Sequence, residues 1–266
     1  MRWAGGKRWL LPTIRDLIGD TEIAVYHEPF LGGASIFLGL PQFPKAHVGD
    51  TNAELIATFR AIRDHPEELA EAVRRPANDS KTYYKVRESS PDVAVERAAR
   101  FIYLNHTSFN GIYRVNLAGK YNVPFGDRSS PQIPTLERLR QVSERLKDAT
   151  LHHRDFATCI GNVGKGHLVF LDPPYTVAHN FNGFVKYNQR LFSFDDQRRL
   201  SELIDEVKKK GAYYILTNAR HESIAKLFDK GDSVMETSRK NVIGGAGADR
   251  GSATEYLFTN LGLPTR

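Results

Sequence analysis

A short apolar run that ends in two prolines constrains the fold more than any other feature of this sequence. Residues 168–171, Leu-Val-Phe-Leu, are continuously apolar, which is typical of a strand buried in a parallel sheet. Pro173 and Pro174 cannot donate to a sheet ladder, so the strand must end before them. Because ligands bind at the carboxyl ends of strands in open α/β sheets, Asp172 and Tyr175 are predicted site residues.

A second pattern, near the start, predicts the opening of a doubly wound nucleotide-binding sheet. Residues 23–30 predict a strand that leads into a turn with Gly32 and Gly33, and residues 35–40 predict the start of a helix. The next predicted strand ends at Asp50. An acid at that place suits a nucleoside site, where it would bond ribose hydroxyls; the alternative is an ordinary turn between a strand and a helix.

The rest of the chain predicts one α/β domain interrupted by a mostly helical insert. Helical periodicity covers residues 8–18, 52–64, 66–75, 94–105, 135–147, 194–211 and 222–228, and strand patterns cover residues 46–50, 149–156, 167–172 and 212–218. Since the long helical stretch separates the first strands from the later ones, we place the insert at residues 63–148.

The insert contains a segment with the pattern of a β-hairpin. Glycines flank alternating residues in the range 109–126, which predicts a hairpin with an Ala-Gly turn. Aromatic side chains alternate there with Arg114, Lys120 and several asparagines. Aromatic wedges between base steps and an arginine on a guanine edge would explain this mixture. The alternative is an amphipathic hairpin that packs on its own domain.

The composition of the chain limits its partners, its metal sites and its location in the cell. The net charge of +6 and the isoelectric point of about 9.3 are compatible with a polyanionic partner, although many basic proteins bind no nucleic acid. The single cysteine, Cys159, excludes an internal disulfide framework and a four-cysteine metal site. The sequence has no apolar run long enough to span a membrane, and its first residues lack a signal-peptide pattern, so we expect a cytoplasmic protein. The "AGGK" segment lacks the spacing of a phosphate loop, so ATP chemistry is unsupported.

The Asp-Pro-Pro-Tyr tetrad at residues 172–175 suits one kind of reaction. An exocyclic aromatic amine is a poor nucleophile, because its lone pair is delocalised into the ring. The Asp172 carboxylate and the Pro173 carbonyl could accept both N–H groups while the nitrogen pyramidalises, and Tyr175 could stack on the base. A target base inside a duplex must first be flipped out, at a cost of about a few kcal/mol.

Five blocks, "RWAGGK", "EPFLGGASIF", "VGDTNAELI", "FNGIYRVN…NVPFG" and "DPPY", follow in an order that resembles the Dam-type (D12 class) DNA adenine-N6 methyltransferases. The resemblance covers residues 2–260. It implies a Rossmann-like class I S-adenosyl-L-methionine-dependent methyltransferase sheet, with residues 1–62 and 149–266 as the catalytic domain and residues 63–148 as the target-recognition domain. The implied reaction transfers a methyl group from S-adenosyl-L-methionine to a flipped-out adenine of double-stranded DNA, within GATC or a related GAT-containing site.

The same resemblance implies the site residues. The implied catalytic residues are Asp172, Pro173, Pro174 and Tyr175. The implied cofactor-binding residues are Trp3, Lys7, Phe30, Gly32, Gly33, Asp50, Asp155, Phe156 and Asp172. The implied DNA-binding residues are Arg2, Phe109, Asn110, Arg114, Asn116, Pro124 and Arg128. Arg2 stands near the start of the sequence, so we expect it to be poorly ordered without DNA.

Two departures from the family pattern stand out. The glycine loop reads "FLGGAS" where many members have F-x-G-x-G, so Ala34 replaces the second spaced glycine. After "PFG" the chain continues with "DRSS", where GATC-methylating members often carry an aromatic residue used in recognition.

The sequence leaves two alternative functions open and suggests which partners the protein has. The alternatives are an RNA adenine methyltransferase and a non-catalytic DNA-binding module; a protein-glutamine methyltransferase would prefer Asn at position 172. We expect a monomer with no membrane or metal partner, located in the cytoplasm at the nucleoid of a prokaryote or of a phage-infected cell. A restriction endonuclease working with it would be a separate chain, because no nuclease domain is fused to it.

Overall fold

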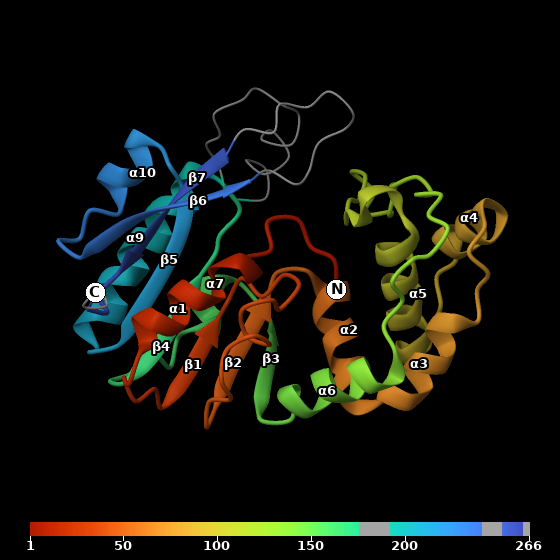
Figure 1. The fold of residues 1–266 in the computed structure, drawn as a ribbon, viewed down its shortest axis with the longest axis horizontal. Helices are drawn as coiled ribbons and strands as arrows, with labels where there is room; N and C mark the ends of the chain where they lie inside the picture. Colours follow the sequence, from red (N-terminus) through yellow and green to blue (C-terminus); the bar gives the residue numbers. More distant parts are fainter. Residues whose placement is uncertain (176–191, 241–251, 263–266) are drawn as a thin grey trace. The chain divides into compact units, whose positions relative to one another are not determined.

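The computed structural model describes residues 1–175, 192–240 and 252–262, and the chain forms two compact units (Figure 1). Unit 1 consists of Met1–Arg8, Leu31–Gln42 and Gly49–Arg154, and unit 2 consists of Trp9–Phe30, Phe43–Val48 and Asp155–Arg266. The three-part division into residues 1–62, 63–148 and 149–266 stays a prediction.

A seven-stranded sheet has the strand order β3-β2-β1-β4-β5-β7-β6 (Figure 1). Strand β1 is parallel to β2 and β4, β4 is parallel to β5, and β7 is antiparallel to both β5 and β6. The predicted α/β fold class is thereby confirmed. The strands are β1 (Val25–Glu28), β2 (Ala46–Asp50), β3 (Ala149–His153), β4 (His167–Leu171), β5 (Tyr213–Ala219), β6 (Ser233–Lys240) and β7 (Ser252–Thr259).

The predicted buried strand is β4, and it ends where the prolines begin. Its residues from Leu168 to Leu171 are buried on both faces, as their unbroken apolar run requires. Strand β4 lies between β1 and β5, so Asp172 follows the end of a central strand. Because parallel strands share the direction of their carboxyl ends, β4 and β5 deliver Asp172 and Thr217 to the same edge of the sheet.

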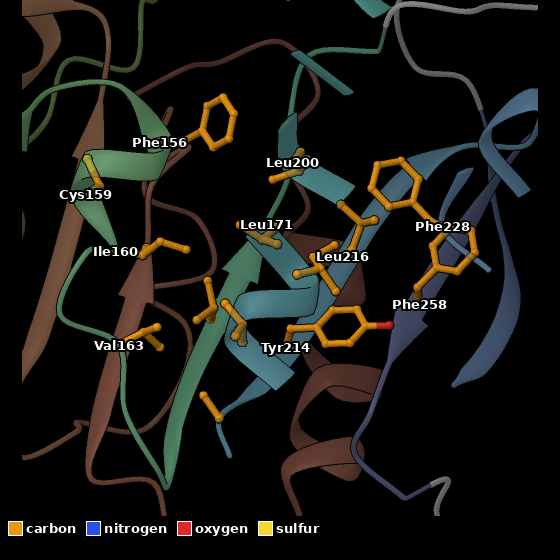
Figure 2. Close-up of a cluster of buried hydrophobic side chains, with 14 of the residues drawn as sticks. Phe156, Cys159, Ile160, Val163, Leu171, Leu200, Tyr214, Leu216, Phe228 and Phe258 are labelled. Carbon is orange, nitrogen blue, oxygen red and sulfur yellow. The ribbon is translucent and has the colours of Figure 1, made fainter. Parts of the chain in front are cut away.

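Helices of unit 2 cover an aromatic and aliphatic core. The cluster joins Phe156, Leu171, Leu200, Tyr214, Phe228 and Phe258 with smaller residues, and Figure 2 shows these side chains between the strands and the helices. Cys159 is buried in the same cluster. The 3-10 helix η1 (Arg8–Leu10) precedes the helices α1 (Leu11–Ile18), α7 (Phe156–Cys159), α9 (Phe194–Lys209) and α10 (Glu222–Leu227).

Unit 1 contains a group of helices in which α5 packs against both α2 and α3 (Figure 1). Side-chain caps fix where three of the helices begin: Asn52, Asp79 and Thr135 each accept a backbone N–H from the first turn. The helices are α2 (Ala53–Asp64), α3 (Pro66–Arg74), α4 (Ser80–Glu88), α5 (Ala94–Thr107) and α6 (Leu136–Leu146), and the 3-10 turn η2 is Phe109–Gly111.

The helix predicted to start at residues 35–40 is wrong. This segment makes consecutive turns, with the N–H of Leu38 donating to Ala34 O and that of Leu40 to Ile36 O, and it then stops. Gly39 lowers the helix propensity, and Pro41 disfavours helical geometry at the residue before it. Arg145 of α6 donates to the carbonyls of Phe37 and Leu40, which replaces further helical bonds.

The predicted hairpin forms, held by two isolated antiparallel bridges rather than by long strands. The bridges join Ser108 to Phe125 and Val115 to Tyr121. The three-residue loop between Asn116 and Lys120 ends in Gly119, whose φ of 72° is the left-handed conformation that such a hairpin loop requires.

None of the helices in the described ranges is long and apolar enough to cross a membrane.

Candidate functional site

In unit 1, the glycine turn and Asp50 form one hydrogen-bonded structure. The Gly32 N–H donates to Asp50 Oδ2 at 3.0 Å, and the Asn52 N–H donates to Asp50 Oδ1 at 2.9 Å. Gly32 has a φ of 46°, which favours glycine. Burial raises the pKa of Asp50, and the backbone N–H groups of Asn52 and Gly32 oppose that rise. Asp50, which was predicted to bond ribose hydroxyls, thus closes the glycine turn.

Trp3 packs directly on the glycine turn. A Cβ at Gly32 would lie 2.7 Å from Trp3 Cδ1, so this position needs glycine, and one at Gly33 would lie 3.0 Å from Trp3 Cβ, a tight contact. Trp3 also stacks on Tyr113 of the hairpin segment, with ring centroids 5.6 Å apart. The indole is therefore held between the glycine turn and the hairpin. The nearby Lys7 is buried, and its Nζ donates to Gly5 O at 3.2 Å.

The backbone of Arg2, which the sequence analysis expected to be poorly ordered without DNA, is held by a buried side chain of α5. The Arg2 N–H donates to Asn105 Oδ1 at 2.8 Å, and Asn105 Nδ2 donates to Arg2 O at 2.8 Å. The Asn105 amide thus binds both the N–H and the carbonyl of Arg2, and these two bonds fix the backbone directly before Trp3. A Cβ at Gly111 would lie 2.5 Å from Arg2 Cδ, so the hairpin also limits the arginine.

In unit 2, the Asp-Pro-Pro-Tyr tetrad follows β4 and is held by two neighbouring strands. The Thr217 hydroxyl of β5 donates to Asp172 Oδ1 at 2.7 Å. The Tyr175 hydroxyl donates to Glu255 Oε2 of β7 at 2.8 Å. Burial raises the pKa of Tyr175 well above its usual value, and the Asp172 and Glu255 carboxylates raise it further. The phenol therefore stays protonated and acts as a hydrogen-bond donor. Pro173 is buried, while Asp172, Pro174 and Tyr175 are partly exposed.

An aromatic cluster in the same unit contains two of the predicted cofactor residues. Phe30 stacks on Phe156 with ring centroids 5.4 Å apart, and both contact Phe192. The Arg199 guanidinium lies 4.8 Å from the centre of the Phe156 ring and donates to Asp155 Oδ1 at 2.8 Å. Asp155 also caps α7 by accepting the Ala157 N–H. Asp155 and Phe156 are thus fixed by Arg199, a residue that the sequence did not indicate.

The hairpin residues of unit 1 divide into exposed side chains and residues that hold the hairpin together. Phe109 is 53% exposed, as a wedge requires. Arg114 Nε donates to Asn122 Oδ1 at 2.8 Å, which orients the guanidinium across the hairpin. Asn116 accepts the N–H groups of Ala118 and Lys120, so its amide oxygen stabilises the turn.

Three further predicted DNA-binding residues lie in or beside the hairpin. Asn110 has a φ of 55°, an uncommon conformation for a residue other than glycine. The Pro124 carbonyl accepts the Phe109 N–H at 2.9 Å. Arg128 O accepts from Asn78, and Arg128 Nη1 is buried with no hydrogen-bond partner within the described part of the chain.

Within each unit, the structure brings predicted residues together. Unit 1 joins Trp3, Gly32, Gly33 and Asp50, and unit 2 joins Phe30 to Phe156 and links the tetrad to Thr217 and Glu255. Sequence reasoning missed Thr217, Glu255 and Asn105. An isolated acid directly before the apolar run Tyr-Leu-Phe in "TEYLFT" was a signal for Glu255, whereas nothing local distinguishes Asn105. Among the described residues, no group of three His, Cys, Asp or Glu side chains could hold a metal ion.

The acid, two prolines and tyrosine that follow β4 are the pattern from which the sequence predicted methyl transfer to an amine. Comparison with known proteins identifies the family: the profile of the D12 class N6 adenine-specific DNA methyltransferases matches residues 3–243, and the chain belongs to this family. It is an adenine-specific DNA methyltransferase.

Named relatives agree with this assignment. The chain is 35% identical over 273 residues to the type II methyltransferase M1.LlaDCHI of Lactococcus lactis subsp. cremoris, covering 98% of this chain and 94% of the relative. It is 30% identical over 272 residues to the type II methyltransferase M.MjaIII of Methanocaldococcus jannaschii, covering 94% of each chain. It is 30% identical over 224 residues to a DNA adenine methylase of Salmonella typhi, covering 82% of this chain and 79% of the relative.

Proposed function

We propose that the enzyme uses S-adenosyl-L-methionine to methylate a flipped-out adenine of duplex DNA, within GATC or a related GAT-containing site. The observation that carries the proposal is the tetrad after β4, in which Asp172 and Tyr175 are each fixed by a hydrogen bond from or to a neighbouring strand. Family membership supplies the adenine and DNA classes.

The side chains present fit the proposed cofactor. Asp50 accepts two N–H groups, yet a carboxylate has about four acceptor sites, so capacity remains for the two ribose hydroxyls. The Phe30 and Phe156 rings offer apolar faces for the adenine moiety, and Trp3, Lys7, Gly32, Gly33, Asp155 and Asp172 complete the proposed cofactor-binding set. When bound, S-adenosyl-L-methionine supplies a methyl group on a positively charged sulfur.

The tetrad prepares the amine for attack. The Asp172 carboxylate accepts one N6–H of the target adenine, the Pro173 carbonyl accepts the other, and Pro174 holds the chain extended. With both protons held out of the ring plane, the nitrogen lone pair is withdrawn from the ring and becomes nucleophilic. Tyr175 stacks on the base and offsets part of the cost of unstacking it from the duplex, about a few kcal/mol.

The hairpin is the proposed DNA-recognition element. The half-exposed Phe109 is placed to wedge between base steps, and Arg114, oriented by Asn122, is placed to read a guanine edge. Arg2, Asn110, Asn116, Pro124 and Arg128 belong to the proposed DNA-binding set. The net charge of +6 favours a polyanion. We propose a monomer that acts in the cytoplasm, at the nucleoid, with any restriction endonuclease as a separate chain.

One experiment tests this function. Labelled S-adenosyl-L-methionine is incubated with the enzyme and either unmethylated genomic DNA or total RNA, and methylated adenines in the DNA are then mapped at base resolution. We expect label in DNA at one short motif that contains GAT. Label at a motif without GAT would reject the proposed specificity, and label transferred to RNA in preference to DNA would reject duplex DNA as the substrate.

A further inference from the structure

We propose that Thr217 and Glu255 are positioning residues for methyl transfer: Thr217 sets the orientation of the Asp172 carboxylate, and Glu255 fixes the ring of Tyr175. This inference rests on the proposed function of the tetrad. It adds two residues from strands β5 and β7, outside the tetrad itself.

The sheet topology places both residues beside the tetrad. Strand β5 is parallel to β4, with Leu216 in register with Leu171, so Thr217 lies next to Asp172. Strand β7 is antiparallel to β5, with Thr217 in register with Leu257. Because Glu255 lies two residues from Leu257, Thr217 and Glu255 point to the same face of the sheet.

Thr217 has the chemistry of an orienting donor. Its hydroxyl lies 2.7 Å from Asp172 Oδ1 and 3.5 Å from Leu171 O, and the residue is fully buried. A β-branched side chain has few χ1 rotamers, so the hydroxyl is held in place by the strand. The Asp172 carboxylate has to accept an N6–H from one direction, and a hydrogen bond from such a donor fixes the orientation of the carboxylate. The bond also satisfies one acceptor site of Asp172 and holds its Oδ1 beside Thr217 of β5.

Glu255 has the chemistry of an anchor for the phenol. It is 3% exposed, and its Oε2 accepts the Tyr175 hydroxyl at 2.8 Å. Fixing the hydroxyl removes rotation about the Cα–Cβ bond of Tyr175, so the ring face keeps one orientation. A ring that stacks on a flipped base needs this restraint, since a misplacement of about 1 Å can reduce a rate roughly 100-fold. The hydroxyl thus acts through positioning, and the ring face contacts the base.

The closeness of the four groups supports one network rather than two separate bonds. The pKa of Tyr175 responds first to its burial, then to the Asp172 and Glu255 carboxylates, and the Thr217 side chain acts on it in the opposite direction. Thr217 therefore bonds to Asp172 and lies close enough to Tyr175 to influence its pKa. Displacing Thr217 or Glu255 is expected to disturb both Asp172 and Tyr175.

The test compares matched substitutions. Thr217→Val removes the hydroxyl and keeps the shape, and Thr217→Ser restores the hydroxyl. Glu255→Leu removes the acceptor, and Glu255→Gln retains an amide oxygen. Thr259→Val is the control for the loss of a buried β-sheet hydroxyl, because Thr259 donates to the Tyr214 carbonyl at 2.7 Å. Asp232→Leu is the control for the loss of a phenol acceptor, because Asp232 Oδ2 accepts the Tyr214 hydroxyl at 2.8 Å.

The kinetic readout is the single-turnover rate of methyl transfer to a duplex that contains the mapped motif. We expect Thr217→Val and Glu255→Leu each to lower this rate about 10- to 100-fold at saturating S-adenosyl-L-methionine. Thr217→Ser and Glu255→Gln should recover most of the rate. The two control variants should keep the wild-type rate.

A second readout is independent of methyl transfer. The target adenine is replaced by 2-aminopurine, whose emission rises on leaving the duplex stack and falls on stacking against Tyr175. We expect Glu255→Leu to raise the emission of the enzyme-bound duplex above the wild-type value, because the ring no longer holds the base. Equal emission in the two complexes would overturn the role of Glu255.

The outcomes separate the two proposals. A wild-type enzyme that labels no adenine in DNA would reject the proposed function. An active wild type with Thr217→Val at the wild-type rate would overturn the inference about Thr217 alone. Equal rate losses in Thr217→Val, Thr217→Ser and the Thr259→Val control would assign Thr217 a purely structural role.

Discussion

A buried histidine in α5 makes the folded state sensitive to acid. His106 is 8% exposed, and burial lowers its pKa to about 4, with smaller contributions from the chain's N-terminal ammonium group and Arg2. A hydrogen bond with the backbone of Gln132 acts in the opposite direction but is the weakest cause. His106 is therefore neutral in the folded protein at pH 7, and charging it requires taking up a proton in a buried site.

The sign and size of the effect follow from the two pKa values. The unfolded chain protonates this histidine near its ordinary pKa of 6.5, and the folded chain only near pH 4. Between these values the unfolded state binds more protons, so the free energy of unfolding falls as the pH falls. At about 1.4 kcal/mol per pKa unit, the difference between the two pKa values lowers the free energy of unfolding by roughly 3 kcal/mol once the folded protein is also protonated. At pH 5 the loss is roughly 2 kcal/mol. Below pH 4 the loss from this residue is complete.

Urea denaturation of the wild type and of His106→Gln at pH 7 and pH 5 measures this contribution. We expect the variant to be less stable at pH 7, because it loses a buried contact, and to lose about 2 kcal/mol less than the wild type between the two pH values. Burial also lowers the pKa of His152 and His167, so a residual dependence on pH remains in both proteins. Equal losses in both proteins, at unchanged dependence on urea, would refute the assignment of acid sensitivity to His106.

Three further predictions concern the glycine turn, the N-terminal segment and the hairpin. Gly32→Ala places a Cβ 2.7 Å from Trp3 and should weaken S-adenosyl-L-methionine binding at least about 10-fold by calorimetry, whereas Gly119→Ala, with no atom near its Cβ, should not; equal affinities would contradict this. Asn105→Ala removes both bonds to the backbone of Arg2 and should lower the free energy of unfolding by about 1–3 kcal/mol in urea denaturation; an unchanged midpoint would contradict it. Arg114→Ala should relax discrimination at one base pair by about 1–3 kcal/mol in competition assays with single-base variants of the site; unchanged discrimination would move recognition elsewhere.

Patterns that act within one strand or one turn were predictable from the sequence. The unbroken apolar run before Asp172 specified a central strand, and the prolines specified its end. The strand that ends at Asp50 follows the predicted range without change. Asn52 then caps α2 with its side chain, a local interaction that sequence patterns describe well.

Interactions between distant segments were not predictable. Asn105 meets Arg2 across 103 positions of the sequence, and Thr217 meets Asp172 across 45 positions. Neither pair leaves a periodic pattern, because each depends on which strands and helices become neighbours. Strands β6 and β7 were not predicted either: Val234 and Met235 are the only apolar residues of β6, and β7 pairs antiparallel beside a parallel sheet. The site residues that orient others were therefore the ones missed.

Trp3 shows how the glycine turn and the hairpin are joined within unit 1. Its indole contacts Gly32 on one side and stacks on Tyr113 on the other, while Asn105 fixes the backbone just before it. The Tyr113 hydroxyl in turn donates to Glu54 of α2 at 3.1 Å. A displacement of the hairpin would therefore move Tyr113 and press it against Trp3. Trp3 packs against Gly32, so it could move in that direction only if the turn closed by Asp50 shifted as well. Because packed side chains of this kind have few alternative arrangements, motion of the hairpin and geometry of the glycine turn are mechanically linked through one side chain.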